Sequence, residues 1–386
     1  MAGALVPQAI IPAYLATSLK PNMDGTINPS GIEDLNSIIG MTSPKGNLFP
    51  VTFMDHGMID NFDYFSVFLE RLPYTTLNFD TRSSPLVITD PVYNLPENRE
   101  KIAEVVFESN DFPGLSIQKQ PICSILSNLH LNKNKELTGL VVDAGDGACQ
   151  ITPVCMGFPI LSLVTQIPLA GKDVTFQLTK LLREREKIPA EHAFEIASWL
   201  KQTECYVCQD PVKEFAKYDA DPQKYFLDLK YKTKNGKTYQ FKTGYERFMA
   251  GEFFFAPDTL NDEYKKPLPD LCIETIGRSP VDFRRRLALN INLSGGSTMF
   301  KNLDRRLQIE MQQQFDDRLE ASFKATGYKS KPFEVCIPKD KNQLYRVFFG
   351  ASMLANDPQF LPMIISKEMY NEHGPKLFRK NHKITV

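Results

Sequence analysis

The sequence predicts an α/β fold with more than one hydrophobic core. Short apolar strands alternate with amphipathic helices along much of the chain, which is typical of α/β proteins. Two glycine-rich turns, within the segments 141–147 and 292–298, each follow a predicted buried strand. Glycine lets the backbone at such a turn come close to a ligand. The pattern around 141–147 resembles one half of a clamp for nucleotide phosphates, and we find no second acidic, glycine-rich turn near the N-terminus.

Composition sets limits on the class of protein. The chain has 386 residues, of which 42% are apolar and 24% charged, so it can bury two or more cores. A formal net charge of -1 gives no overall attraction to nucleic acid or to an anionic membrane. No apolar run approaches the roughly 20 residues that span a bilayer. We therefore expect no nucleic-acid partner and no insertion into a membrane.

The N-terminus and the cysteines indicate a cytoplasmic protein. The first residues are apolar, but no basic residue precedes Lys20, and Pro7 and Pro12 interrupt any helix of the kind found in signal peptides. The seven cysteines are scattered, and only Cys205 and Cys208 are closely spaced, with no second pair to complete a zinc site. We expect free thiols in a reducing compartment.

The first third of the chain predicts irregular structure followed by strand–helix alternation. Residues 1–50 are poor in charge and rich in proline and glycine, which favours irregular backbone. Apolar side chains then recur with helical spacing over 62–69, and residues 86–88 form a short apolar strand. A proline at position 96 is predicted to begin an amphipathic helix that extends to position 107.

The first glycine-rich turn is predicted to join two strands. Residues 140–142 read as a buried strand, 143–147 as a tight turn and 148–154 as the returning strand. A helix is expected next, with Asp173 as its N-cap and the apolar residues between 174 and 182 on one face.

The second half of the chain contains the second glycine-rich turn. Residues 183–264 are more charged and aromatic, with a hairpin predicted at 232–236, and they suggest a mostly helical lobe within the α/β frame. A strand at 289–293 is expected to lead through the Gly–Gly turn directly into a helix with apolar residues over 300–311. Such a helix start can bind an anion or a ribose. Residues 345–354 are expected to pass from strand to helix.

Several stretches of the chain together resemble the actin family. The most specific are residues 96–100, 107–109, 141–147, 167–173, 212–219, 244–248, 293–300, 352–355 and 374–375. The segment 212–219 contains VKEF and KYD, where conventional actin differs. Within the family the chain therefore resembles an actin-related subunit of the complex that nucleates branched filaments.

The resemblance implies the actin-like ATPase fold, which the family shares with Hsp70 and sugar kinases. This fold has two lobes of two subdomains each, with ATP and a divalent cation between the lobes. The implied boundaries are 50–133 with 345–386 for subdomain 1, 8–49 for subdomain 2, 134–170 with 265–344 for subdomain 3, and 171–264 for subdomain 4. The family's N-terminal phosphate-loop hairpin has no counterpart here, so we expect one phosphate loop and a less stable first sheet.

The resemblance also implies a nucleotide site that holds ATP or ADP with Mg²⁺ or Ca²⁺. The implied nucleotide-binding residues are Asp143, Gly145, Asp146, Gly147, Lys201, Gly295, Gly296 and Ser297. Asp143 would reach the metal through water, and the backbone N–H groups after it would bind the phosphates. Lys201 would contact the nucleoside, and Gln120 would orient the attacking water. The alternative is that these are turn residues which the fold retains for its own geometry.

Four departures from the family pattern predict weak or absent hydrolysis. Ala144 replaces a serine that binds phosphate, and Gln150 replaces a histidine near the attacking water. Gln202 replaces an acidic partner beside Lys201, and Leu344 replaces a basic residue that covers the adenine. Each lost charge-assisted contact costs about 1.5 to 3 kcal/mol. We therefore expect a non-enzyme with residual nucleotide binding.

Three functions remain open from the sequence. The first is a subunit of the branching complex, whose partners would be a second actin-related protein, the other subunits, the actin filament and nucleation-promoting factors. Its faces could include 147–157 and 348–354. The second is an ATP-dependent phosphotransferase or ATPase, which would need two phosphate loops and a general base. The third is an actin-like scaffold of dynactin or of a chromatin remodeller. The segment 212–219 favours the first.

Overall fold

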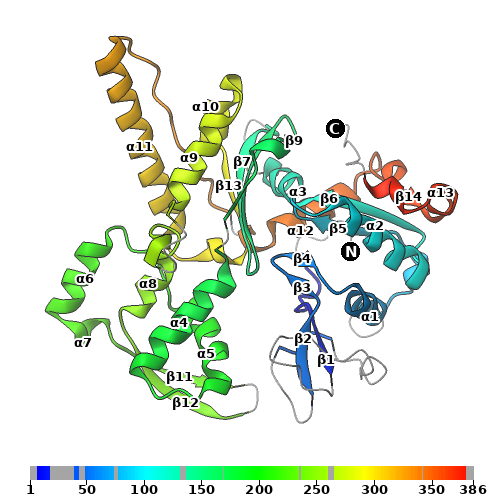
Figure 1. Cartoon of the computed structure of the whole chain (residues 1–386), viewed down its shortest axis with the longest axis horizontal. Helices are drawn as coiled ribbons and strands as arrows, with labels where there is room; N and C mark the ends of the chain where they lie inside the picture. The colour runs from blue at the N-terminus through cyan, green and yellow to red at the C-terminus, as the bar shows by residue number, and fades with distance from the viewer. Residues whose placement is uncertain are drawn as a thin grey trace. The chain divides into compact units, whose positions relative to one another are not determined.

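The chain divides into two compact units, each with its own hydrophobic core. The first unit comprises Met1–Ser127 and Val347–Val386, and the second comprises Asn128–Arg346. The structure, a computed structural model shown in Figure 1, describes residues 7–17, 39–42, 48–73, 77–130, 136–167, 169–233, 236–259, 265–340 and 342–379. The finer division into subdomains stays a prediction.

A three-stranded sheet forms the centre of the first unit, in the order β14-β6-β5. Strand β5 (Leu86–Asp90) runs parallel to β6 (Gly114–Lys119), and β14 (Ile365–Ser366) is antiparallel to β6. The predicted strand at 86–88 is confirmed, although most of β5 is only half-buried. Its parallel partner β6 is almost completely buried.

Two helices of the first unit lie where the sequence predicts them. Helix α1 (Phe62–Leu72) has Asn61 as its N-cap, and the Asn61 side chain accepts a bond from the Tyr64 N–H at 2.9 Å. Helix α2 (Pro96–Glu104) has its proline in the first turn and continues as a π-helical turn through Ser109. The other helices are α3 (Gln120–Ser127), α12 (Arg346–Ala355) and α13 (Lys367–His373).

The prediction of irregular chain over residues 1–50 is wrong for Tyr14–Thr17. These residues form β1, which pairs antiparallel with β2 (Phe49–Thr52). The long-range pairing buries Leu15, which local composition does not reveal. A further pair, β3 (Met54–Asp55) and β4 (Met58–Ile59), follows. Most of the predicted subdomain 2, at 8–49, lies outside the described residues.

The sheet of the second unit carries the predicted hairpin. Its order is β10-β8-β7-β13, and β9 pairs with β8. The strands are β7 (Gly139–Ala144), β8 (Cys149–Cys155), β9 (Phe158–Pro159), β10 (Thr165–Ile167) and β13 (Ile291–Ser294). The turn is shorter than predicted, because Asp143 and Ala144 still pair with Gln150 and Cys149 in the ladder.

Helices and one β-ribbon make up the rest of the second unit (Figure 1). The helices are α4 (Gly171–Arg185), α5 (Ala190–Thr203), α6 (Pro211–Ala220), α7 (Pro222–Tyr225), α8 (Glu246–Glu252), α9 (Leu268–Arg278), α10 (Val281–Leu289) and α11 (Leu303–Thr326). The ribbon β11 (Leu227–Lys232) with β12 (Thr238–Thr243) confirms the predicted hairpin. One core includes Val142, Leu178, Leu200, Ile273 and Leu307.

Three predicted element boundaries in the second half of the chain are wrong. Asp173 is not the N-cap of α4, which begins at Gly171; its carboxylate instead accepts the Ala170 N–H at 2.9 Å from the first turn. The Gly–Gly turn leads into a short 3-10 turn, and α11 begins only at Leu303, after Asn302 with a left-handed φ of 69°. Residues 345–354 contain no strand; a 3-10 turn, Gln343–Tyr345, passes directly into α12.

The cysteines are unpaired, as the sequence predicts. All seven cysteines are free thiols, and Cys205 and Cys208 are both buried. Among the described residues no cluster of three or more His, Cys, Asp or Glu side chains could hold a metal. The same part of the chain contains no helix long and apolar enough to cross a membrane.

Helix α12 packs so closely on α3 that it requires glycine at position 350. A Cβ added to Gly350 would collide with the backbone carbonyl of Cys123. Gly350→Ala is therefore expected to destabilise the chain by about 2 to 4 kcal/mol, because backbone must move to make room. Urea unfolding followed by circular dichroism would measure the loss.

Gly277→Ala is the matched control, since a Cβ at this helical glycine would meet no atom within 4 Å. Here alanine is expected to be neutral or to stabilise by up to about 1 kcal/mol, through its higher helix propensity. Equal unfolding midpoints for the two variants would contradict the close approach of α12 to α3.

Candidate nucleotide-binding site

The turn between β7 and β8 is held in place by its carbonyl groups. The Gly145 carbonyl accepts the Gly171 N–H at 3.0 Å and the Ser297 hydroxyl at 2.7 Å. The Asp146 carbonyl accepts the Lys172 N–H at 2.8 Å. The first turn of α4 and the second glycine-rich segment therefore fix the turn from two directions. The predicted Gly145 donor is used within the turn, because its N–H bonds the Ala148 carbonyl at 2.9 Å. The N–H groups of Asp146 and Gly147 are the remaining candidates for phosphate oxygens in this fixed turn.

Gly171 is the residue around which the site is assembled. A Cβ at this position would lie 2.6 Å from the Ser297 hydroxyl, 3.0 Å from the Asp146 carboxylate and 3.1 Å from the Lys201 ammonium. Three segments far apart in the sequence therefore meet at one glycine. Sequence reasoning did not include Gly171 in the site, although a glycine at the start of a predicted helix was a usable signal.

Lys201 brings a buried positive charge to the same place. It lies in the last turn of α5, and its side chain is only 10% exposed. The ammonium donates to the Gly171 carbonyl at 2.8 Å and lies 3.5 Å from the Asp146 carboxylate. Burial lowers the pKa of Lys201, and the nearby Asp146 carboxylate opposes that shift. The cation is thus fixed beside the turn and can attract an anionic ligand.

Asp143 is the candidate residue for a metal held through water. It lies near the end of β7, opposite Ser294 of β13 in the parallel ladder. Burial raises the pKa of the Asp143 carboxyl, and a hydrogen bond with Ser294 opposes the shift in part. One carboxylate suits Mg²⁺ that keeps several waters and takes its other ligands from phosphates. A metal bound with its nucleotide therefore fits these residues better than a metal held by protein alone.

The segment Gly295–Ser297 presents open backbone next to the turn. Gly295 has a φ of 89°, and a Cβ there would collide with the carbonyl of Ala144, so both conformation and space require glycine. A Cβ at Gly296 would meet only the Leu344 side chain, at 3.6 Å. The exposed face of Gly296 can therefore accept a flat group, with Leu344 beside it.

The residues that depart from the family pattern mostly lie at this site. Ala144 is buried at the end of β7 and offers no hydroxyl group. Gln150 is buried directly across the ladder from Asp143. The Gln202 side chain is exposed and donates to Ser198 at 3.4 Å. Leu344 is 41% exposed beside Gly296. The site thus has fewer charged and protic groups than the family pattern implies.

The structure brings together the eight predicted nucleotide-binding residues within the second unit. Gln120 belongs to the first unit, where it is the half-buried first residue of α3. Its role in orienting water stays a prediction.

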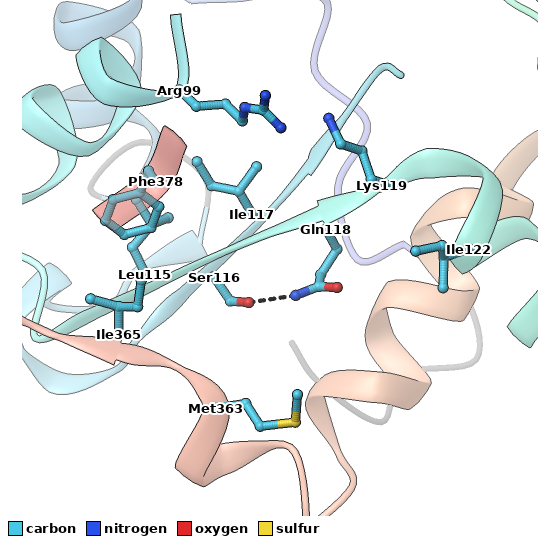
Figure 2. Close-up of a pocket in the computed structure, with 10 residues that line it drawn as sticks. All are labelled: Arg99, Leu115, Ser116, Ile117, Gln118, Lys119, Ile122, Met363, Ile365 and Phe378. Carbon is cyan, nitrogen blue, oxygen red and sulfur yellow. Dashed lines mark hydrogen bonds between the residues drawn. The ribbon is translucent and has the colours of Figure 1, made fainter. Parts of the chain in front are cut away.

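The first unit contains a small cavity along β6, drawn in Figure 2. Arg99 and Lys119 point toward the same space at one end, and both are within 4 Å of the buried Asp90 carboxylate, at 3.8 and 2.5 Å. Gln118 donates to Ser116 at 2.7 Å. The cavity volume of about 30 Å³ is enough for a water molecule or two, and far too small for a nucleotide.

Comparisons with known proteins find a family model and relatives that match almost the whole chain. A family model described as Actin matches residues 1–198 and 190–383. The chain is 37% identical to actin-related protein 3 of Drosophila melanogaster over 390 residues, 98% of this chain and 93% of that protein. Identity is also 37% to actin-related protein 3 of Caenorhabditis elegans over 401 residues and to that of Dictyostelium discoideum over 388 residues, with the same coverage. The α/β architecture, the glycine-rich hairpin and these matches show that the chain belongs to the actin family.

Proposed function

We propose that the chain is an actin-related protein 3-like subunit of the actin-related protein 2/3 complex, which nucleates branched actin filaments. The observation that carries the proposal is similarity to three relatives named actin-related protein 3, each aligned over 98% of this chain. Its partners would be actin-related protein 2, the other subunits, the actin filament and nucleation-promoting factors, in the cytoplasmic actin cytoskeleton. These relatives favour this function over a phosphotransferase and over a scaffold of dynactin or a chromatin remodeller.

The second unit would bind ATP or ADP with a divalent cation. The Gly145 N–H bonds the Ala148 carbonyl at 2.9 Å, so the N–H groups of Asp146 and Gly147 would supply the backbone donors for phosphates. Buried Lys201 supplies positive charge. Gly296 leaves room for the nucleoside, and Asp143 would hold the water shell of the cation. When bound, the cation would neutralise phosphate charge. Nucleotide would then stabilise this unit, because the ligand binds the folded state alone.

Hydrolysis would be weak at this site. Ala144 has no hydroxyl group to donate to a phosphate oxygen, and the Gln150 amide cannot relay a proton as an imidazole can. General acid–base catalysis contributes roughly 10² to 10⁴ in rate where it operates. The nucleotide would therefore act as a structural ligand with slow turnover.

Membership in the complex predicts a specific set of co-purifying proteins. A tagged full chain, expressed in its own cytoplasm, is expected to bring down actin-related protein 2 and the companion subunits in constant ratio. The tag alone, expressed at the same level, is the control. Recovery of a folded, monodisperse chain with none of these subunits would contradict the proposal.

Because hydrolysis would be slow, the chain is expected to bind ATP measurably while it releases little phosphate. Purified chain is expected to bind ATP in calorimetry and to release phosphate barely above background. Gln150→His, which restores an imidazole opposite Asp143, is expected to raise turnover severalfold at similar ATP affinity. A wild-type rate like that of conventional actin would show that the present residues suffice for hydrolysis.

A further inference from the structure

A side-chain link joins the 3-10 turn Gln343–Tyr345 to the second glycine-rich segment. The Gln343 amide donates to the Thr298 carbonyl at 3.0 Å and to the Thr298 hydroxyl at 2.7 Å. That hydroxyl donates in turn to the Gly295 carbonyl at 2.7 Å. One amide is therefore connected through Thr298 to the backbone that lines the candidate site.

Arg346 anchors the other end of the same turn. Its side chain is completely buried, and it bonds the Asp340 carboxylate at 3.1 and 3.3 Å. It also donates to the Asn292 side-chain oxygen at 3.2 Å, on strand β13. A buried ion pair of this kind is costly to break, because one partner would be left charged without compensation. The turn is thus held to β13 at Arg346 and to Thr298 at Gln343.

Leu344 lies between these two anchors. Its Cδ1 atom is 3.6 Å from the position that a Cβ would take on Gly296, and no other atom lies within 4 Å of that position. A leucine that is 41% exposed thus faces open glycine backbone. An apolar wall opposite bare backbone suits the flat, apolar face of a base and offers nothing to a phosphate.

We propose that Gln343 is a positioning residue that holds Leu344 as the base-side wall of the nucleotide site. The inference rests on the nucleotide site proposed above and adds that base recognition depends on Gln343, separately from phosphate recognition. The phosphate turn Gly145–Gly147 is held by Gly171 and Ser297, and it has no bond to Gln343 among those that the described residues make. Loss of Gln343 is therefore expected to weaken binding of the base and to leave binding of the phosphates unchanged.

Calorimetry with two probes separates recognition of the base from recognition of the phosphates. Mg·ATP carries a base, whereas Mg·tripolyphosphate carries the phosphates alone. Gln343→Ala and Leu344→Ala are each expected to weaken ATP binding about tenfold, which is the scale of a small apolar contact, and to leave tripolyphosphate binding unchanged. The double variant is expected to be no weaker than either single variant, since Gln343 acts through Leu344. Gln313→Ala, an exposed glutamine on α11, is the matched control.

Hydrogen exchange tests the link without any ligand. The Thr298 N–H bonds the Gly295 carbonyl at 3.2 Å, and its exchange is expected to become faster in Gln343→Ala while the amides of β13 stay protected. Equal loss of affinity for Mg·ATP and Mg·tripolyphosphate in Gln343→Ala would overturn the positioning role of Gln343 alone. Additive losses of ATP affinity in the double variant would do the same. Wild-type chain that binds neither probe would overturn the nucleotide site and the base wall together, even if exchange at Thr298 changed as expected.

Discussion

The close approach of α4 to the β7–β8 turn is the contact on which the candidate site depends. The Gly171 N–H bonds the Gly145 carbonyl, and the space beside its α-carbon is occupied by groups from Asp146, Lys201 and Ser297. Any side chain at position 171 would push these groups apart. The turn, the Lys201 ammonium and the second glycine-rich segment all meet there. In the proposed site, this one backbone contact would therefore set the positions of the phosphate donors, the positive charge and the nucleoside contact.

Buried polar groups then hold the elements that surround this contact. The Arg346 pair with Asp340 fixes the segment that bears Leu344. In the first turn of α11, Arg306 forms a two-pronged bond with Glu252, at 2.5 and 2.8 Å, and stacks over the Phe255 ring. Loss of one partner from such a pair is strongly destabilising, because it leaves the other charge buried and uncompensated. The first unit uses the same device at Asp90, where two cations converge on one buried carboxylate.

Local sequence pattern predicted the elements well and their boundaries less well. The helical spacing of apolar residues located α1 and α2, and the apolar run at 140–142 located β7, which is buried on both faces. The returning strand β8 and the β11–β12 hairpin were also predicted. Local pattern failed for β1, whose pairing partner lies more than 30 residues away, and for the start of α4, where tertiary hydrogen bonds determine the first turn. The eight predicted nucleotide-binding residues came from the resemblance to the actin family, and all eight lie in the second unit. Gly171 and Gln343 were missed because their roles arise only from contacts between distant segments.

The affinity of Gly171→Ala for Mg·ATP, measured by calorimetry beside Gly277→Ala, tests whether nucleotide binding depends on the close approach of α4 to the β7–β8 turn. The added methyl group is expected to displace Ser297, Asp146 and Lys201 and to weaken ATP binding by about 10- to 100-fold, equivalent to about 1.5 to 3 kcal/mol. The Gly277 control is predicted to bind as the wild type does. An unchanged ATP affinity in a folded Gly171→Ala chain would show that the site does not depend on this contact.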